Sequence, residues 1–344
     1  MSLILDLKLA KNQSERNAMQ SQISQVVDYR IAGHNAMSEY LRITNAGRTP
    51  ADAYREFDST TKIEVNKMGE FATLTRLMQV SRPVSIGKTK FEYRKNSGMD
   101  NGQTSMSGQT AIILDQTDYG YAGVPIPIHD KSFGRIWRDY EAMRSEGFDA
   151  LVDDAREAEL GLMRTMNSFL FSGSASISVN GSTWLGLTSG SESTIDTYTP
   201  TVDISSPTAT YAQIFGELKV ARDRLQIDNN CMQPLMVGIS AAAMSNMERD
   251  ISPDTALAGT ILDYVKKLTG IEEIYVDSAL TGGKFIMYWA NQQGLHPVVG
   301  MGINTYAVPR IMHNDNFNFV KWSAVGFCAK TSFAGYKCVL FGNK

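Results

Sequence analysis

The acidic residues Asp153, Asp154, Glu157 and Glu159 are the densest group in this sequence that could perform acid–base chemistry. Two carboxylates held close together can act as a general acid and a general base. Their surroundings predict a long helix, however, and Asp153 and Asp154 fall in its opening turns, where the helix dipole favours negative charge. We therefore interpret these residues as solvated or dipole-stabilising groups and not as a catalytic pair.

Other residues that build active sites are scattered. The four histidines, His34, His129, His296 and His313, have no metal-ligand spacing to one another or to the cysteines. The chain contains no phosphate-binding GxxxxGK[ST] loop, no GxGxxG after a strand, no GxSxG elbow and no HExxH motif. We predict that the protein is not an enzyme and has no catalytic, cofactor-binding or metal-binding residues. A chain of this length without a recognisable site is more often structural.

The three cysteines, Cys231, Cys328 and Cys338, show no CxxC pairing. Cys328 and Cys338 lie in apolar, strand-like sequence, which favours buried free thiols and a reducing compartment.

Four basic residues, Lys88, Lys90, Arg94 and Lys95, alternate with aromatic residues in one predicted strand. They could form a nucleic-acid patch, or they could protect the edge of a hairpin and meet an acidic partner surface. We favour the second interpretation. The formal net charge of −3 argues against tight wrapping of nucleic acid, although a protein that only encloses nucleic acid remains compatible with it.

The composition is that of a soluble globular protein. With 344 residues, 43% of them hydrophobic, the chain has material for a large core and for roughly two domains. No apolar run reaches the ~18 residues that a membrane-spanning helix needs, so we predict no contact with a membrane.

The acidic residues lie in a long predicted helix. Apolar residues recur with helical spacing over 148–172, which predicts a spine helix ending at Ser172-Gly173. A more polar helix is predicted over 13–46, and short strand and helix segments follow near 61–66 and 68–78.

Residues 81–128 predict a long hairpin, with strands at 83–95 and 110–124 joined by a Gly-, Asn- and Ser-rich loop. The prolines at 125 and 127, where the second strand ends, exclude the hydrogen bonding of a central strand there. A short helix is predicted at 133–144.

The remainder alternates between helices and strands. Residues 211–302 predict helices that cover a mixed sheet. Residues 303–344 predict strands that pack against the spine helix.

The order of these parts, together with Pro125-Ile-Pro-Ile-His-Asp-Lys-Ser-Phe133, Arg138-Asp139 and Phe171-Ser-Gly173, resembles major capsid proteins of tailed double-stranded DNA bacteriophages. Their Hong Kong 97-type fold is shared by encapsulin shells. The run Gly270–Val276, followed by Lys284–Tyr288, resembles the paired strands of the middle domain in such proteins.

The resemblance implies an α+β fold of the Hong Kong 97 type with four parts. These are an N-terminal arm (1–80), an extended hairpin loop (81–128), a peripheral domain with the spine helix (129–210 and 303–344) and an axial domain (211–302).

The function implied is that of a structural virion protein. Hexamers and pentamers of the chain would form an icosahedral capsid around packaged double-stranded DNA, without sequence-specific binding. The implied partners are further copies of the chain and decoration, scaffolding and portal proteins. The implied location is the virion capsid, assembled in the host cytoplasm.

The arm and the hairpin are the parts that we expect to contact neighbouring subunits, because an isolated two-stranded hairpin is marginally stable in water. The candidate interface residues are Met19, Ile23, Val26, Val27, Lys88, Lys90, Arg94, Lys95, Met99 and Met106.

Two alternatives stay open. An encapsulin-like nanocompartment that binds cargo is the first, although the arm of ~80 residues argues against it. An uncharacterised enzyme is the second, and it would need two perturbed titratable groups in one pocket.

Overall fold

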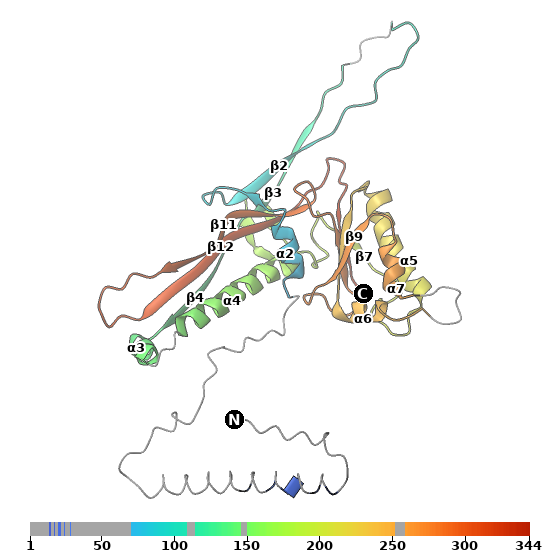
Figure 1. Cartoon of the computed structure of the whole chain (residues 1–344). Helices are drawn as coiled ribbons and strands as arrows, with labels where there is room; N and C mark the ends of the chain where they lie inside the picture. The colour runs from blue at the N-terminus through green and yellow to red at the C-terminus, as the bar shows by residue number, and fades with distance from the viewer. Residues whose placement is uncertain are drawn as a thin grey trace, which may run out of the picture. The chain divides into compact units, whose positions relative to one another are not determined.

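The computed structural model describes residues 70–108, 114–145, 150–251 and 259–344, together with six residues between 14 and 28. Contacts divide the chain into two units, Met1–Lys62 and Ile63–Lys344. The elements labelled from α2 onward in Figure 1 all belong to the second unit.

The first unit contributes six described residues, all helical and exposed: Ser14, Asn17, Gln20, Ser21, Ser24 and Asp28. They confirm helix at these positions of the predicted segment 13–46. The candidate interface residues Met19, Ile23, Val26 and Val27, and the strand predicted at 61–66, lie outside the described residues.

The described helices of the second unit are α2 (Ala72–Met78), α3 (Trp137–Ser145), α4 (Ala150–Ser172), α5 (Tyr211–Asp223), the π-helical turn η3 (Arg224–Asp228), α6 (Ala241–Met247) and α7 (Ile261–Lys266). Side chains fix where several of them begin. Thr210 and Gln213 form a reciprocal capping box at the start of α5, and Thr260 and Asp263 form another at α7.

The strands form two larger sheets and two hairpins. The four-stranded sheet contains, in order, β1 (Arg82–Pro83), β11 (Leu295–Ala307), β12 (Phe317–Ala329) and β4 (Ile128–Arg135). The five-stranded sheet contains β7 (Asp196–Tyr198), β13 (Val339–Gly342), β10 (Phe285–Tyr288), β8 (Leu235–Ile239) and β9 (Ile271–Val276). β2 (Lys90–Asn96) pairs with β3 (Tyr119–Pro125), and β5 (Ser174–Val179) with β6 (Ser182–Trp184).

Helix α4 is the predicted spine, and it lies along β4 and β12 (Figure 1). Its buried face includes Leu162, Met166 and Leu170. Its acidic residues pair with cations of the sheet: Arg135 reaches Asp154, and Lys321 Nζ lies 2.6 Å from Glu159 Oε2. These two carboxylates therefore serve the packing of the helix on the sheet, and they point to different strands.

Strand β4 lies at the edge of the four-stranded sheet, where it pairs with β12 alone among the described strands. The helix predicted from residue 133 is wrong at its start, because β4 continues to Arg135 and α3 begins at Trp137. The alternating pattern of β4, which pairs along its whole length with β12, overrides the local helical periodicity.

The five-stranded sheet has two buried faces. Phe285 and Met287 of β10 join a core with α5, α6 and α7, whereas Ile286 and Tyr288 join a second core with α2, α4 and the four-stranded sheet. This alternation with a period of two is what a strand buried on both sides requires.

The terminal strands are divided between the sheets. β12 packs beside the spine, but β13 pairs with β10 in the five-stranded sheet. Residues 303–344, which we expected to pack together against the spine helix, therefore contribute to both cores.

Helix α2 is fixed to the five-stranded sheet by a buried polar network. The Thr73 N–H donates to Asp277 Oδ2 at 2.9 Å, and the hydroxyls of Tyr275 and Tyr288 lie 2.8 Å apart. Burial raises the pKa of Asp277. Arg76 extends the connection, because its guanidinium lies 3.9 Å from the ring centroid of Tyr275.

The cysteine prediction holds for one residue and fails for another. Cys328 is a buried free thiol, and burial raises its pKa to about 12. Cys338 forms a disulfide with Cys231, so its expected free thiol is wrong. The sequence separation of 107 residues hides this pair, which forms because the turn after η3 lies next to the segment that enters β13.

Removing this disulfide by the double substitution Cys231→Ser/Cys338→Ser will lower the free energy of unfolding by about 4 kcal/mol, because the bond closes a long loop of the unfolded chain. Urea denaturation of unassembled subunits measures the loss. Dithiothreitol should destabilise the wild type to the same extent and leave the variant unchanged. A wild type insensitive to the reductant would contradict the prediction.

Candidate subunit interface

The paired part of the hairpin is short. Seven residues of β2 pair with β3, from Lys90↔Pro125 to Asn96↔Tyr119, and the Ser97 N–H then donates to the Asp118 carbonyl at 3.0 Å. The described residues between 97 and 118 contain neither helix nor strand. The strand predicted over 83–95 is too long at its start, because β2 begins at Lys90, and the strand predicted over 110–124 is too long because residues 114–118 are not strand. Between β2 and β3 the hairpin continues as an extended loop (Figure 1).

The residues of β2 alternate between the body and solvent. Phe91, Tyr93 and Lys95 face inward, and the residues between them are exposed. The Tyr93 hydroxyl accepts a hydrogen bond from the Thr331 N–H at 3.0 Å, and Lys95 Nζ donates to the Thr331 hydroxyl. The base of the hairpin is thus bound to the segment that follows β12.

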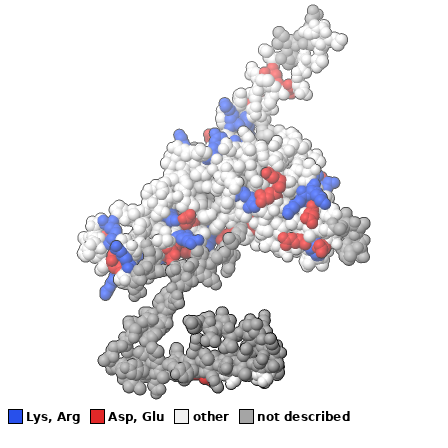
Figure 2. All heavy atoms as spheres, in the orientation of Figure 1, with Lys and Arg blue, Asp and Glu red and all other residues white. Residues whose placement is uncertain are grey.

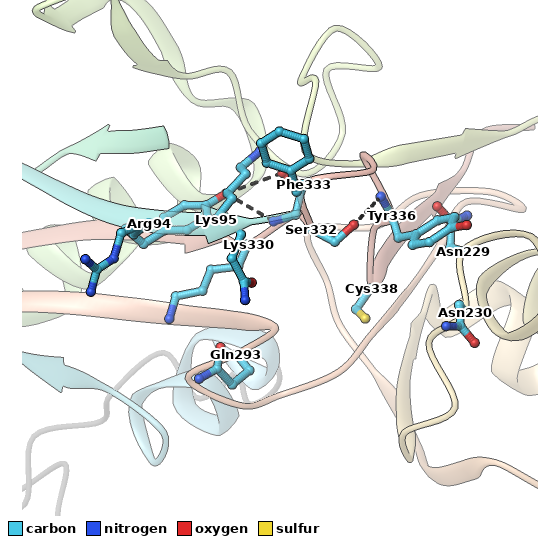
Figure 3. A pocket seen from close by; sticks show the side chains of 13 residues that line it. Arg94, Lys95, Asn229, Asn230, Gln293, Lys330, Ser332, Phe333, Tyr336 and Cys338 are labelled. Atoms are coloured by element: carbon cyan, nitrogen blue, oxygen red, sulfur yellow. Dashed lines mark hydrogen bonds between the residues drawn. The ribbon is translucent and has the colours of Figure 1, made fainter. Parts of the chain in front are cut away.

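A pocket of about 360 Å³ lies at this base (Figure 3). Its lining comes from β2, the turn after η3, and the segments around 293 and 330–338. Figure 3 shows Arg94, Lys95 and Lys330 on one side of the pocket and Asn229 and Asn230 on the other. No carboxylate is among the described residues that line it.

The three cations of this pocket have aromatic neighbours. Lys95 and Lys330 each lie 5.7 Å from the ring centroid of Tyr93, and Arg94 lies 5.3 Å from that of Tyr119. Across the described ranges, none of the three forms an ion pair. Burial lowers the pKa of Lys95 and of Lys330, and Arg82 lowers the latter further.

Farther out, the hairpin has the opposite charge. Residues 96–130 contain Asp100, Asp115, Asp118 and Asp130 and no lysine or arginine. Figure 2 shows positive side chains where the hairpin leaves the body and only negative ones beyond them. Met99, Met106 and Leu114 of this part are strongly exposed.

The predicted interface residues of the hairpin have different surroundings. Lys88, Arg94, Met99 and Met106 are exposed. Lys90 pairs with Glu92 of the same strand at 2.5 Å. Lys95 faces inward. The hairpin base therefore presents fewer cations to solvent than the alternation of basic and aromatic residues in the sequence indicated.

Lys330 was not among the predicted residues. It follows the apolar strand β12 and is the only charged residue between 322 and 336, a signal that could have identified it. Asn229 and Asn230 carried no comparable signal, because the fold alone brings them to the pocket.

A second exposed surface lies at the outer end of β11 and β12. Five large apolar residues are exposed there: Ile303, Tyr306, Val308, Ile311 and Met312. We expected the segment after residue 303 to pack against the spine, but the outer half of β11 is in contact with solvent.

His296 of β11 lies beneath the hairpin base. Its side chain is completely buried, its ring centroid is 6.0 Å from that of Phe91, and neither ring nitrogen has a hydrogen-bond partner among the described residues. Burial, together with the positive charges of Lys330 and Arg82, lowers its pKa to about 4.

Acidification from pH 7 to pH 4.5 should therefore destabilise the wild-type subunit more than a His296→Leu variant. An unfolded histidine binds its proton near pH 6.5, whereas folded His296 resists protonation down to about pH 4. The stability that this group supports is fully present above pH 6.5 and is lost as the pH falls toward 4. The difference at pH 4.5 should be about 2 kcal/mol. Urea denaturation of unassembled subunits at both pH values measures it, and equal losses in the two proteins would speak against it.

The described residues contain neither a metal site nor a membrane-spanning helix. No group of three or more His, Cys, Asp or Glu residues there could hold a metal ion. No helix in the same ranges is long and apolar enough to cross a bilayer.

Comparison with known proteins supports the fold. Residues 44–342 match the Family of unknown function (DUF6260). No curated protein matches the chain in sequence. Among solved structures, the capsid of Myoviridae phage XM1 is similar with a TM-score of 0.63 and 9% identity, covering 87% of this chain and 100% of that one.

Two further structures share the architecture. A structure from Mycobacterium phage Adephagia has a TM-score of 0.57 and 10% identity, covering 87% of this chain and 98% of its own. A virus-like particle from Pyrococcus furiosus has a TM-score of 0.50 and 16% identity, covering 78% and 91%. The predicted α+β architecture is confirmed: the chain belongs to the DUF6260 family and has the Hong Kong 97-type capsid fold.

Proposed function

We propose that this chain is the major capsid protein of a tailed double-stranded DNA bacteriophage, a non-enzymatic protein that self-assembles into the hexamers and pentamers of an icosahedral shell. The hairpin is the observation that carries the proposal. On a capsid fold, its loop extends beyond a seven-residue ladder and exposes methionines and a leucine that have no core of their own. Such a segment is stabilised when it lies on a neighbouring subunit.

The parts of the chain receive roles in this proposal. The part of residues 1–80 that precedes α2 forms an arm that contacts neighbours, whereas α2 itself packs in the core of its own subunit. Residues 81–128 form the extended loop. The spine helix and the four-stranded sheet form the peripheral domain. The axial domain comprises 211–294 together with β13, in place of the expected 211–302, because β11 begins at Leu295 in the four-stranded sheet and β13 pairs with β10.

The shell encloses packaged DNA without reading its sequence. The small net charge of −3 is compatible with enclosure, in which few phosphates need to be neutralised by each subunit. Scaffolding, portal and decoration proteins are the further partners proposed, with assembly in the host cytoplasm and the virion capsid as the final location.

An encapsulin-like compartment is the second candidate. It is favoured by the match to the Pyrococcus furiosus virus-like particle, which has the higher sequence identity of the structures compared above, 16%. The two candidates predict the same kind of shell with different contents.

Electron microscopy of the purified full chain tests both. Closed shells of one size class are expected. Nuclease-protected double-stranded DNA in particles from the native source would support the capsid protein, and a protein cargo would support the compartment. A dispersed monomer under all assembly conditions would contradict both.

A further inference from the structure

The pocket at the hairpin base lacks a partner for its charge. Arg94, Lys95 and Lys330 line it, and the described part of the chain supplies no carboxylate to it. Lys95 and Lys330 are half-buried, and this burial lowers the pKa of both ammonium groups. Grouping like charges in this way is unfavourable unless an anion binds there.

The same chain carries a segment with the matching chemistry. Between residues 96 and 118, every charged residue is an aspartate: Asp100, Asp115 and Asp118. Asp115 accepts a hydrogen bond from the Asp100 N–H at 2.7 Å, so these two residues lie next to each other across the loop. None of the three forms an ion pair with a described residue.

None of the three aspartates is among the residues that line the pocket of its own chain. Asp100 and Asp115 lie beyond the Ser97–Asp118 pair that ends the ladder, whereas Arg94 and Lys95 lie before it. A Cβ atom placed at Gly98, Gly102 or Gly108 would meet nothing within 4 Å, which shows how open the surroundings of this loop are. Ten extended residues beyond Asn96 span ~33 Å, compared with a radius of gyration of ~19 Å for a domain of this size. The segment is therefore long enough to act on another copy.

We propose that the acidic loop of one subunit, through Asp100, Asp115 and Asp118, docks into the basic pocket of Arg94, Lys95 and Lys330 on a neighbouring copy of this chain. This inference deepens the proposed function and depends on it. Because the loop and the pocket are different surfaces, the contact is heterologous, and repeating it generates a closed ring when the rotation between copies closes.

The exposed side chains of the loop fit this contact. Met99 and Met106 flank the acidic residues and supply flexible apolar surface that adapts to a partner. The pocket offers Phe333 and Tyr336 as apolar lining beside the cations. Charge complementarity then selects the register, because like charges placed opposite each other weaken a wrong alignment.

A charge swap tests the inference. One variant reverses the loop (Asp100→Lys/Asp115→Lys/Asp118→Lys), a second reverses the pocket (Arg94→Glu/Lys330→Glu), and a third combines both. At ~0.15 M salt, each reversal alone should lower the yield of shells about tenfold or more, and the combination should restore most of it. The matched control Lys219→Glu/Lys284→Glu places the same two reversals on α5 and just before β10, and it should assemble like the wild type.

A second measurement uses the wild type alone. Treatment of purified shells with a carbodiimide joins a carboxylate to a lysine amine in direct contact. Mass spectrometry should then find the peptide containing Asp100, Asp115 or Asp118 linked to the one containing Lys95 or Lys330, in shells and not in free subunits. This readout does not depend on whether a variant folds.

The outcomes separate the two proposals. If the wild type forms shells and both single reversals also assemble normally, the docking is overturned and the capsid function stays intact. The same holds if wild-type shells show cross-links from the acidic loop only to other lysines. A pocket reversal that assembles normally but retains less DNA assigns the pocket to nucleic acid and also overturns the docking. A wild type that forms no shells overturns the proposed function, and the docking with it.

Discussion

Replacing residues 98–117 by the dipeptide Asn-Gly will yield a folded subunit that forms no closed shells. The cut follows the structure: Ser97 and Asp118 form a backbone pair at the end of the β2–β3 ladder, and Asn-Gly is the favoured two-residue turn between such strands. None of the described residues in the removed segment belongs to either buried core, so the free energy of unfolding should change by less than about 1 kcal/mol. Sedimentation and electron microscopy measure shell formation, and urea denaturation of subunits measures stability.

A second variant separates the reach of the loop from its side chains. It replaces 98–117 by a Gly/Ser segment of the same length, which can span the same distance but lacks the aspartates and the exposed apolar residues. We expect this variant to fail in assembly as well. Normal shells from the Asn-Gly variant would show that the loop of the hairpin is dispensable. If only the Gly/Ser variant forms normal shells, the length of the loop is required but its side chains are dispensable.

The long elements were predictable because their pattern repeats many times. Apolar periodicity over 148–172 predicted α4, which the structure describes from Ala150 to Ser172, and Gly173 marked its end. The alternating pattern after residue 211 identified a sheet covered by helices for the same reason. The hairpin strands were predicted to begin too early, because strand-like composition does not show where pairing starts; the β2–β3 ladder covers only Lys90–Asn96 and Tyr119–Pro125.

The pocket and the disulfide could not be predicted from local patterns. Lys95 and Lys330 are far apart in sequence, and they meet because Tyr93 of β2 packs against the segment after β12. Cys231 and Cys338 meet for a comparable reason, across 107 residues. Such groupings depend on how separate sheets and turns pack against each other, and the periodicity of each strand contains no information about that packing.

The substitution Gly173→Ala will lower the free energy of unfolding by about 4 kcal/mol. This loss is toward the upper end of those caused by truncating a large core side chain to alanine. Gly173 ends the spine helix with a φ of 59°, and an added Cβ would lie 2.2 Å from the Leu185 carbonyl carbon. That chain segment caps the helix: the Leu187 N–H donates to the Leu170 carbonyl at 3.0 Å, and the Thr188 N–H to the Phe171 carbonyl at 2.9 Å. Urea denaturation of subunits measures the loss.

The control Gly181→Ala separates the two causes of this loss. Gly181 has a φ of 74°, so alanine there bears the same left-handed strain, but nothing lies within 4 Å of its added Cβ. Strain alone should cost about 1 kcal/mol. Equal losses at the two positions would mean that backbone strain is the whole effect. A larger loss at Gly173 would mean that the close approach of residues 184–188 holds the end of the spine, and thus the rigid axis from which a hairpin can reach a neighbour.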